Sequence, residues 1–150
     1  MEEKIQNFNN ALVYDDKIKS ILKLRGKDHV EKTIEQELKE RYFNEDWELM
    51  RDNKNTSRIK KSKPHSVLFE DKVWCIFAKM GFNILNADAN LKLPYTKDDD
   101  IPGRQIDVFA ADDETILIVE CKSSKELQKK SMQQVINDFS TIQRGSQIFF

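Results

Sequence analysis

An aliphatic segment that ends in a charged triplet constrains the fold of this chain most strongly. Residues 115–122 read TILIVECK, so an apolar run is followed directly by Glu120, Cys121 and Lys122. A run without polar alternation is typical of a strand that is covered on both faces of its sheet. A charge at the end of such a strand is costly unless it has a partner. The sequence therefore predicts a sheet between layers of helices, with some partner for these charges.

The segment before this strand predicts a hairpin. Residues 104–110 read RQIDVFA, and the turn-rich sequence ADDE separates them from the aliphatic run. If Asp113 and Glu114 form a two-residue turn, Asp107 lies directly opposite Glu120. Like charges opposed in a sheet are destabilising, and burial increases the cost. A slip of one residue would change this pairing.

Two interpretations of these charges are open. Glu120 and Lys122 are two residues apart and share a face, whereas Cys121 points the other way, into the core. In the first interpretation the carboxylates bind Mg²⁺, which takes carboxylate oxygens and substrate phosphates, and Lys122 orients or deprotonates a water. In the second, Lys122 neutralises one acid in an internal salt bridge. The first predicts that loss of the Asp107 carboxylate leaves stability unchanged or raises it in the absence of metal.

Helices are predicted on either side of the hairpin. The first follows Pro64 and ends at Gly81, with a core stripe of Phe69, Val73, Ile76, Phe77 and Met80. Glu70 borders that stripe and is either a boundary residue with its head in water or a ligand of the site. Between this helix and the hairpin, the sequence predicts short strands over 82–87 and 91–95. After the hairpin it predicts an amphipathic helix over 125–145. The order is helix, three or so strands, helix and strand.

The first 65 residues predict a separate N-terminal extension. Residues 1–50 have helical spacing that breaks at Gly26, and Asp28 with Glu31 resembles a capping box, so we expect a helical hairpin. Residues 51–65 carry six bases and one acid. They are either a solvated linker or a strap that contacts phosphates. The lysines of this strap expected to contact nucleic acid are Lys60, Lys61 and Lys63.

Composition narrows the class of protein. A chain of 150 residues can form one domain with a real core, here expected over 66–150. It has no long apolar run, no secretion signal and only two cysteines, so we expect a soluble cytoplasmic protein without membrane contacts. The apolar strand start SQIFF at 146–150 suggests a core truncated at its C-terminal end.

The residues of the predicted hairpin resemble a known family. QIDVFA followed by ILIVECKSS is similar to the PD-(D/E)XK nuclease superfamily, and within it to Mrr-type restriction enzymes and archaeal Holliday junction resolvases. The resemblance covers residues 66–150 and implies the restriction-endonuclease-like fold, whose core has the element order given above. Ile106 replaces the proline of the family's name.

The resemblance also implies roles for individual residues. Asp107 and Glu120 would be metal ligands, together with the backbone carbonyl of Cys121 and the helix acid Glu70, and Lys122 would be the catalytic lysine. The cofactor would be Mg²⁺, with Mn²⁺ as a substitute. Further lysines beside the site are suited to holding a DNA backbone: Lys125, Lys129 and Lys130.

We therefore expect an α/β protein with a restriction-endonuclease-like core, in which a mixed central sheet is flanked by helices and preceded by the helical hairpin. The expected function is Mg²⁺-dependent DNA cleavage of a restriction or resolvase-like kind. Specificity would come from a homodimer or an additional domain or subunit, because no base-reading motif is present. The alternatives are a nucleic-acid-binding domain of the same fold without cleavage, and a structural domain with an ion-pair network.

Overall fold

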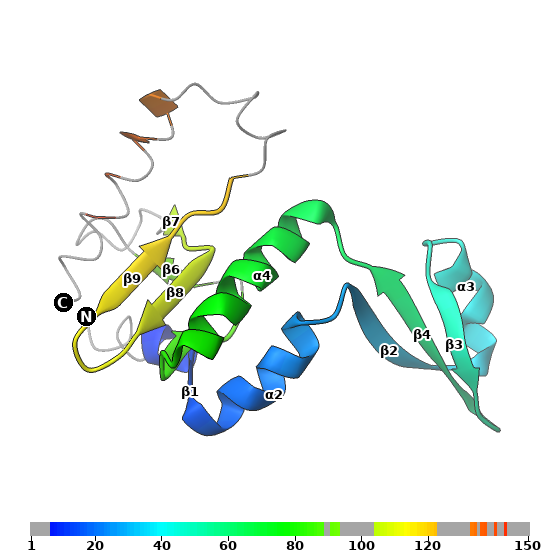
Figure 1. The fold of residues 1–150 in the computed structure, drawn as a ribbon. Helices are drawn as coiled ribbons and strands as arrows, with labels where there is room; N and C mark the ends of the chain where they lie inside the picture. The colour runs from blue at the N-terminus through cyan, green and yellow to red at the C-terminus, as the bar shows by residue number, and fades with distance from the viewer. Residues whose placement is uncertain are drawn as a thin grey trace.

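The computed structural model describes residues 7–88, 91–93 and 104–122, and six positions of the last third: 133, 134, 136, 137, 140 and 143. It is a mixed α/β structure with antiparallel sheets and helices (Figure 1). The α/β class predicted from the sequence is therefore confirmed. The expected mixed central sheet is wrong for the described residues, in which all strand pairs of this sheet are antiparallel. Within the described residues, no helix is long and apolar enough to cross a membrane.

A four-stranded antiparallel sheet forms the centre of the body. Its order is β1 (Leu12–Tyr14), β5 (Ile84–Asn86), β8 (Val108–Ala111) and β9 (Ile116–Val119). All four residues of β8 are buried, and apolar clusters lie on both faces of the sheet. The strand that the sequence predicts to be covered on both faces is β9. That strand instead lies at an edge of the described sheet, with Ile116 44% exposed.

Two helices pack side by side on one face of this sheet, α2 (Asp15–Arg25) and α4 (His65–Met80) (Figure 1). Helix α4 begins after Pro64, and Gly81 ends it with a φ of 100°, as the sequence predicts. The predicted core stripe of α4 is correct only in part: Val73 and Phe77 pack against the core. The buried residues of α4 are Asp71, Trp74 and Cys75. The other three residues of the stripe face outwards, with exposed fractions of 39% for Phe69, 54% for Ile76 and 67% for Met80.

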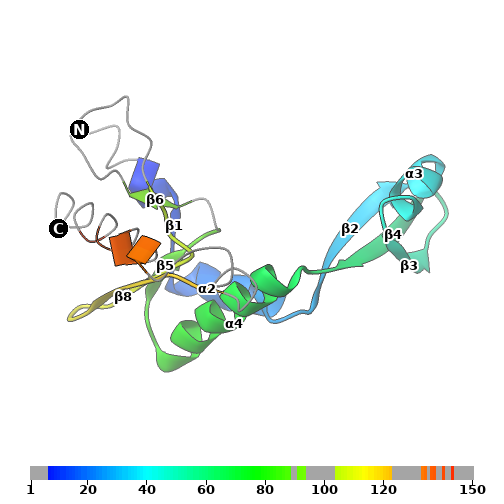
Figure 2. The ribbon, with the colours of Figure 1, turned by 90° about the horizontal axis from the view of Figure 1, so that it is seen from above.

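A second, three-stranded sheet projects from the body (Figure 2). Its order is β2 (His29–Glu35), β4 (Thr56–Ser62) and β3 (Glu48–Asp52), with a 3₁₀ turn η1 (Gln36–Leu38) and the short helix α3 (Lys39–Phe43) between β2 and β3. We call these elements the arm. A small core of Ile34 and Ile59 lies within it.

The arm corrects two predictions. The second helix of the expected hairpin is wrong, because His29–Glu35 is a strand, and Glu31 therefore caps no helix. The expected linker is wrong over Thr56–Ser62, which pairs with strands on both sides. The spacing of Val30 and Ile34 fits a helical turn, but residues at even spacing also share a face of a strand. The β-branched residues Val30, Thr33 and Ile34 favour the strand.

Short elements complete the described chain. Strands β6 (Lys92–Leu93) and β7 (Arg104–Gln105) form a two-stranded ladder that leads into β8. The described positions between 133 and 143 are helical, as predicted, but Ile136 of the expected core side is 50% exposed. The strand expected at 146–150 lies outside the described residues.

Candidate functional site

The β8–β9 hairpin has the register predicted from its turn. Val108 pairs with Val119, and Ala111 pairs with Ile116. The turn is closed by a 3.0 Å hydrogen bond from the Asp112 amide to the Thr115 carbonyl. Oδ1 of Asp112 also accepts the amide hydrogens of Glu114 and Thr115, at 3.0 and 2.7 Å. An aspartate that bonds its own turn in this way fixes the turn and hence the register.

The two predicted carboxylates lie one residue beyond the last ladder pair of this hairpin. Asp107 precedes β8, and Glu120 follows β9. Asp107 does not simply oppose Glu120, because its Oδ2 accepts a 2.7 Å hydrogen bond from the backbone amide of Cys121. This bond gives the half-buried carboxylate a backbone partner on the neighbouring strand.

Lys122 forms an ion pair with Glu120, as their shared face predicts. The ammonium of Lys122 donates to Oε1 of Glu120, and the two side chains are 21% and 16% exposed. This pairing is the contact that the salt-bridge interpretation predicts. It also holds the lysine at the end of the hairpin, where the catalytic interpretation needs it.

The pKa of the Cys121 thiol is affected by the charges of Asp107, Glu70, Glu120 and Lys122. Its side chain is buried in the core between the sheet and the helices, as expected from alternation along the strand. Burial raises the pKa of the thiol to about 12, and the negative charges of Asp107, Glu70 and Glu120 add to this, whereas Lys122 opposes it. The half-buried Glu70 on α4 is thus close enough for its charge to act at the end of the hairpin.

The donor chemistry of this region suits a hard cation. Asp107, Glu120 and Glu70 offer carboxylate oxygens, the ligands that Mg²⁺ and Mn²⁺ prefer. However, no group of three or more His, Cys, Asp or Glu side chains stands ready to hold a metal in the described part of the chain. One oxygen of Asp107 accepts from the Cys121 amide and one of Glu120 from Lys122. The ligands are therefore near one another but are not gathered around one point.

The predicted phosphate-binding lysines have different surroundings. Lys60 lies on β4 with its ammonium 3.4 Å from Oε2 of Glu48, and Lys61 donates to the Glu45 carbonyl at 2.6 Å. The Lys63 side chain is 6% exposed and links α4 to α2. It donates to Asp71 at 2.7 Å and to two carbonyls at the end of α2. Its ammonium is not available to a phosphate while these contacts last. Lys125, Lys129 and Lys130 lie outside the described residues.

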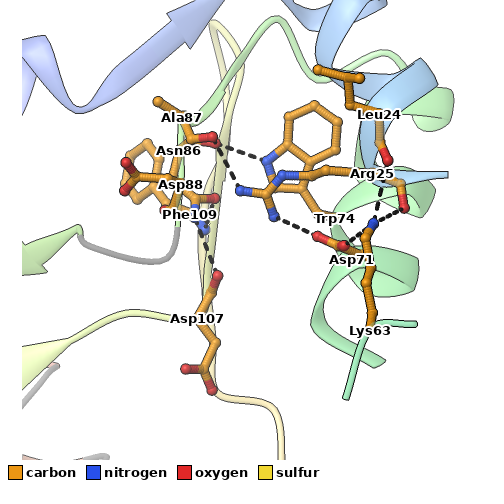
Figure 3. Close-up of polar contacts among 10 residues, drawn as sticks. All are labelled: Leu24, Arg25, Lys63, Asp71, Trp74, Asn86, Ala87, Asp88, Asp107 and Phe109. Carbon is orange, nitrogen blue, oxygen red and sulfur yellow. Dashed lines mark hydrogen bonds and ion pairs between the residues drawn. The ribbon is translucent and has the colours of Figure 1, made fainter. Parts of the chain in front are cut away.

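Sequence reasoning missed a buried polar network beside the site (Figure 3). Arg25 donates to Asp71 and to the Ala87 carbonyl, both at 3.2 Å, and its guanidinium lies 4.8 Å from the centre of the Trp74 ring. Burial lowers the pKa of Arg25, and the charge of Asp71 opposes this. The sequence signal was Asp71 itself, a charge three residues before a tryptophan on an apolar helix.

The network continues to the proposed site through Asn86. Trp74 Nε1 donates to the Asn86 carbonyl at 2.9 Å, and the Asn86 side chain donates to the Asp107 carbonyl at 3.2 Å (Figure 3). Nothing in the sequence distinguishes Asn86 from any asparagine at the end of a strand. Comparison of the chain with protein-family models, with curated proteins and with solved structures found no match.

Proposed function

We propose that this protein is a metal-dependent endonuclease that hydrolyses phosphodiester bonds in DNA. The observation that carries the proposal is the end of the β8–β9 hairpin, where Asp107, Glu120 and Lys122 meet with Glu70 near by. Carboxylates that can hold a metal ion, with an amine near by, can support metal-assisted phosphodiester hydrolysis.

The proposed roles follow from the chemistry of each group. Asp107 and Glu120 would hold Mg²⁺ or Mn²⁺, with the Cys121 carbonyl and Glu70 as further oxygen donors. The bound ion would supply positive charge for the phosphoryl oxygens and lower the pKa of a coordinated water. The Lys122 side chain would orient the attacking water as the ammonium, or receive a proton from that water as the neutral amine.

The restriction-endonuclease-like fold is part of this proposal. Along the described chain, helix α4 precedes β5, β8 and β9, and helical positions follow at 133–143. This order agrees with the one implied by the resemblance. The hairpin at its centre carries the proposed ligands at the same end, which supports the assignment of Asp107 and Glu120.

DNA contacts would come from backbone recognition rather than base reading. Lys60 and Lys61 on the projecting arm remain in the proposed DNA surface, with Lys125, Lys129 and Lys130 after the site. Contacts to phosphates position a duplex without reading its sequence. A second copy of the chain or another subunit would supply specificity.

A second candidate is a domain that binds nucleic acid without cleaving it. The observation that favours it is the pairing of Lys122 with Glu120, together with the lack of an assembled metal-binding group among the described residues. A lysine that neutralises the carboxylate leaves the hairpin end stable without a cation. Cleavage separates the two candidates, because only the first should turn over.

The test is plasmid nicking with and without Mg²⁺ or Mn²⁺. Metal-dependent cleavage by the parent should disappear in Lys122→Ala and persist in Lys72→Ala, which removes an exposed lysine of α4 outside the site. In parallel, the metal should raise the melting temperature of the parent, because it binds only the folded state. A folded parent that neither cleaves nor responds to metal would contradict the proposal and leave the binding domain or the structural domain with an ion-pair network.

A further inference from the structure

Asn86 is the most deeply buried polar side chain next to the proposed site. It ends β5, has an exposed fraction of 0%, and uses both ends of its amide. Its Oδ1 accepts the Phe109 amide hydrogen at 3.0 Å. Its Nδ2 donates to the Asp107 carbonyl at 3.2 Å and to the Asp88 carbonyl at 2.8 Å (Figure 3).

These bonds replace a step of the backbone ladder. Strands β5 and β8 pair at Ile84 with Ala111 and at Leu85 with Ala110, and the ladder stops there. At the next residue the Asn86 carbonyl turns to Trp74 Nε1 instead. The side-chain amide of Asn86 then takes over the bonding to β8. Because a side chain now spans the gap, the two strands can part while their polar groups stay paired.

The place where the strands part is where Asp107 lies. Asn86 bonds the carbonyl of Asp107 and the amide of Phe109, so it holds the chain on both sides of Val108. From the other side, the amide of Cys121, two residues after the end of β9, donates a hydrogen bond to Oδ2 of Asp107. Asp107 is thus held from two neighbouring strands, by its main chain and by its carboxylate.

We propose that Asn86 is a positioning residue that fixes the backbone of Asp107 so that its carboxylate meets the end of β9. This inference rests on the proposed function for its catalytic meaning, but the positioning itself can be tested without metal or DNA. Groups that orient a metal ligand typically change metal affinity or activity by about 10- to 100-fold when they are altered. A residue with a purely structural role would change stability alone.

The test uses Asn86→Asp, which has the shape of asparagine and keeps an acceptor for the Phe109 amide but loses both N–H donors. Asn83→Asp is the matched control: it makes the same change just before β5, at a side chain whose buried Oδ1 has no hydrogen-bond partner among the residues that the structure describes. Asn86→Ser provides a second variant if Asn86→Asp does not fold. All proteins are compared at a temperature at which each is folded.

The first readout is amide hydrogen exchange at Cys121. If Asn86 positions Asp107, the Cys121 amide loses its acceptor in the Asn86 variants and exchanges about tenfold faster or more, while the Asn83 variant matches the parent. The second readout is Mn²⁺ affinity and DNA cleavage. We expect affinity and kcat to fall by about 10- to 100-fold with KM for DNA unchanged.

The outcomes separate the inference from the proposed function. Parent-like exchange at Cys121 in the folded Asn86 variants would overturn the inference, even if the parent cleaves DNA. Equal losses in Asn83→Asp and Asn86→Asp would overturn it as well. A parent that binds no Mn²⁺ and cleaves no DNA would refute the proposed function, and the exchange experiment alone would then decide whether Asn86 positions Asp107.

Discussion

Asp107 is bonded across the hairpin to Cys121: its Oδ2 lies 2.7 Å from the Cys121 amide nitrogen, one residue beyond the last ladder pair. The acceptor for the Cys121 amide is thus the side-chain carboxylate of Asp107 and not a backbone carbonyl. The bond directs Asp107 towards the strand end that carries Glu120 and Lys122. It also gives Asp107 a structural role that was not predicted from the sequence.

This bond reverses the stability expected of an Asp107 variant. Repulsion between carboxylates predicts that Asp107→Ala is as stable as the parent, but the variant leaves the Cys121 amide without its acceptor. We expect a loss of about 1–3 kcal/mol in the free energy of unfolding, measured by urea denaturation. Asp107→Asn keeps an acceptor of the same shape and should stay closer to the parent. Equal stability of the parent and Asp107→Ala would mean that the bond contributes nothing.

Asp71 should be among the most sensitive charged residues of the body. Its two oxygens bind Arg25 at 3.2 Å and Lys63 at 2.7 Å, and all three side chains are buried or nearly so. Asp71→Asn removes the charge and leaves two buried cations unpaired, so we expect a loss of about 3–5 kcal/mol in unfolding free energy. Urea denaturation measures it.

An exposed ion pair provides the control for Asp71. Lys60 and Glu48 pair at 3.4 Å on the arm with well-exposed side chains, so Glu48→Gln should change stability by about 0.5 kcal/mol or less. Similar losses at Asp71 and Glu48 would contradict the distinction between buried and exposed pairs.

Glu31 should make stability depend on pH in the acid range. Hydrogen bonds from Lys27 and Arg58, with a further one from His29, lower the pKa of Glu31 from 4.5 to about 2. A carboxyl group whose pKa is depressed in the folded state stabilises the protein above its unfolded pKa, and this contribution is lost as the pH falls through the folded value. The melting temperature of the parent should therefore exceed that of Glu31→Gln at pH 6, and the difference should shrink between pH of about 4.5 and 2. A difference that does not change with pH would contradict this assignment.

The two cysteines should be unreactive in the native protein. Both Cys75 and Cys121 are buried and form no disulfide. Burial raises the pKa of both thiols, to about 12 for Cys121, so that neither is a thiolate near neutral pH. A thiol reagent such as iodoacetamide should modify both in urea and neither in buffer. Rapid native modification of Cys121 would show that the hairpin end opens readily.

Local patterns in the sequence determined much of the body. The acidic turn set the hairpin register, the aliphatic run and Glu-x-Lys located Glu120 and Lys122, and Pro64 with Gly81 gave the ends of α4. Each of these signals depends on residues close together in the chain. They could therefore be read without knowledge of the packing.

The predictions failed where tertiary contacts decide between two local patterns. Residues 29–35 fit one turn of a helix as well as a strand, and only pairing with Thr56–Ser62 selects the strand. The buried position of Trp74 on α4 depends on its packing against the sheet, where its Nε1 donates to the Asn86 carbonyl. Asn86 itself has a role only because β5 and β8 part beside it. None of these partners is near in sequence.

Asp71 also marks the point at which the arm joins the body. The chain leaves at Arg25 and returns at Lys63, and the Lys63 ammonium lies 3.2 Å from the Arg25 carbonyl. Helix α2 and helix α4 are therefore neighbours whether or not the intervening sheet is present. The arm is thus attached like a loop by two adjacent ends, and a short connector could bridge them without rearranging the body. A chain shortened in this way should still form the hairpin that carries Asp107 and Glu120.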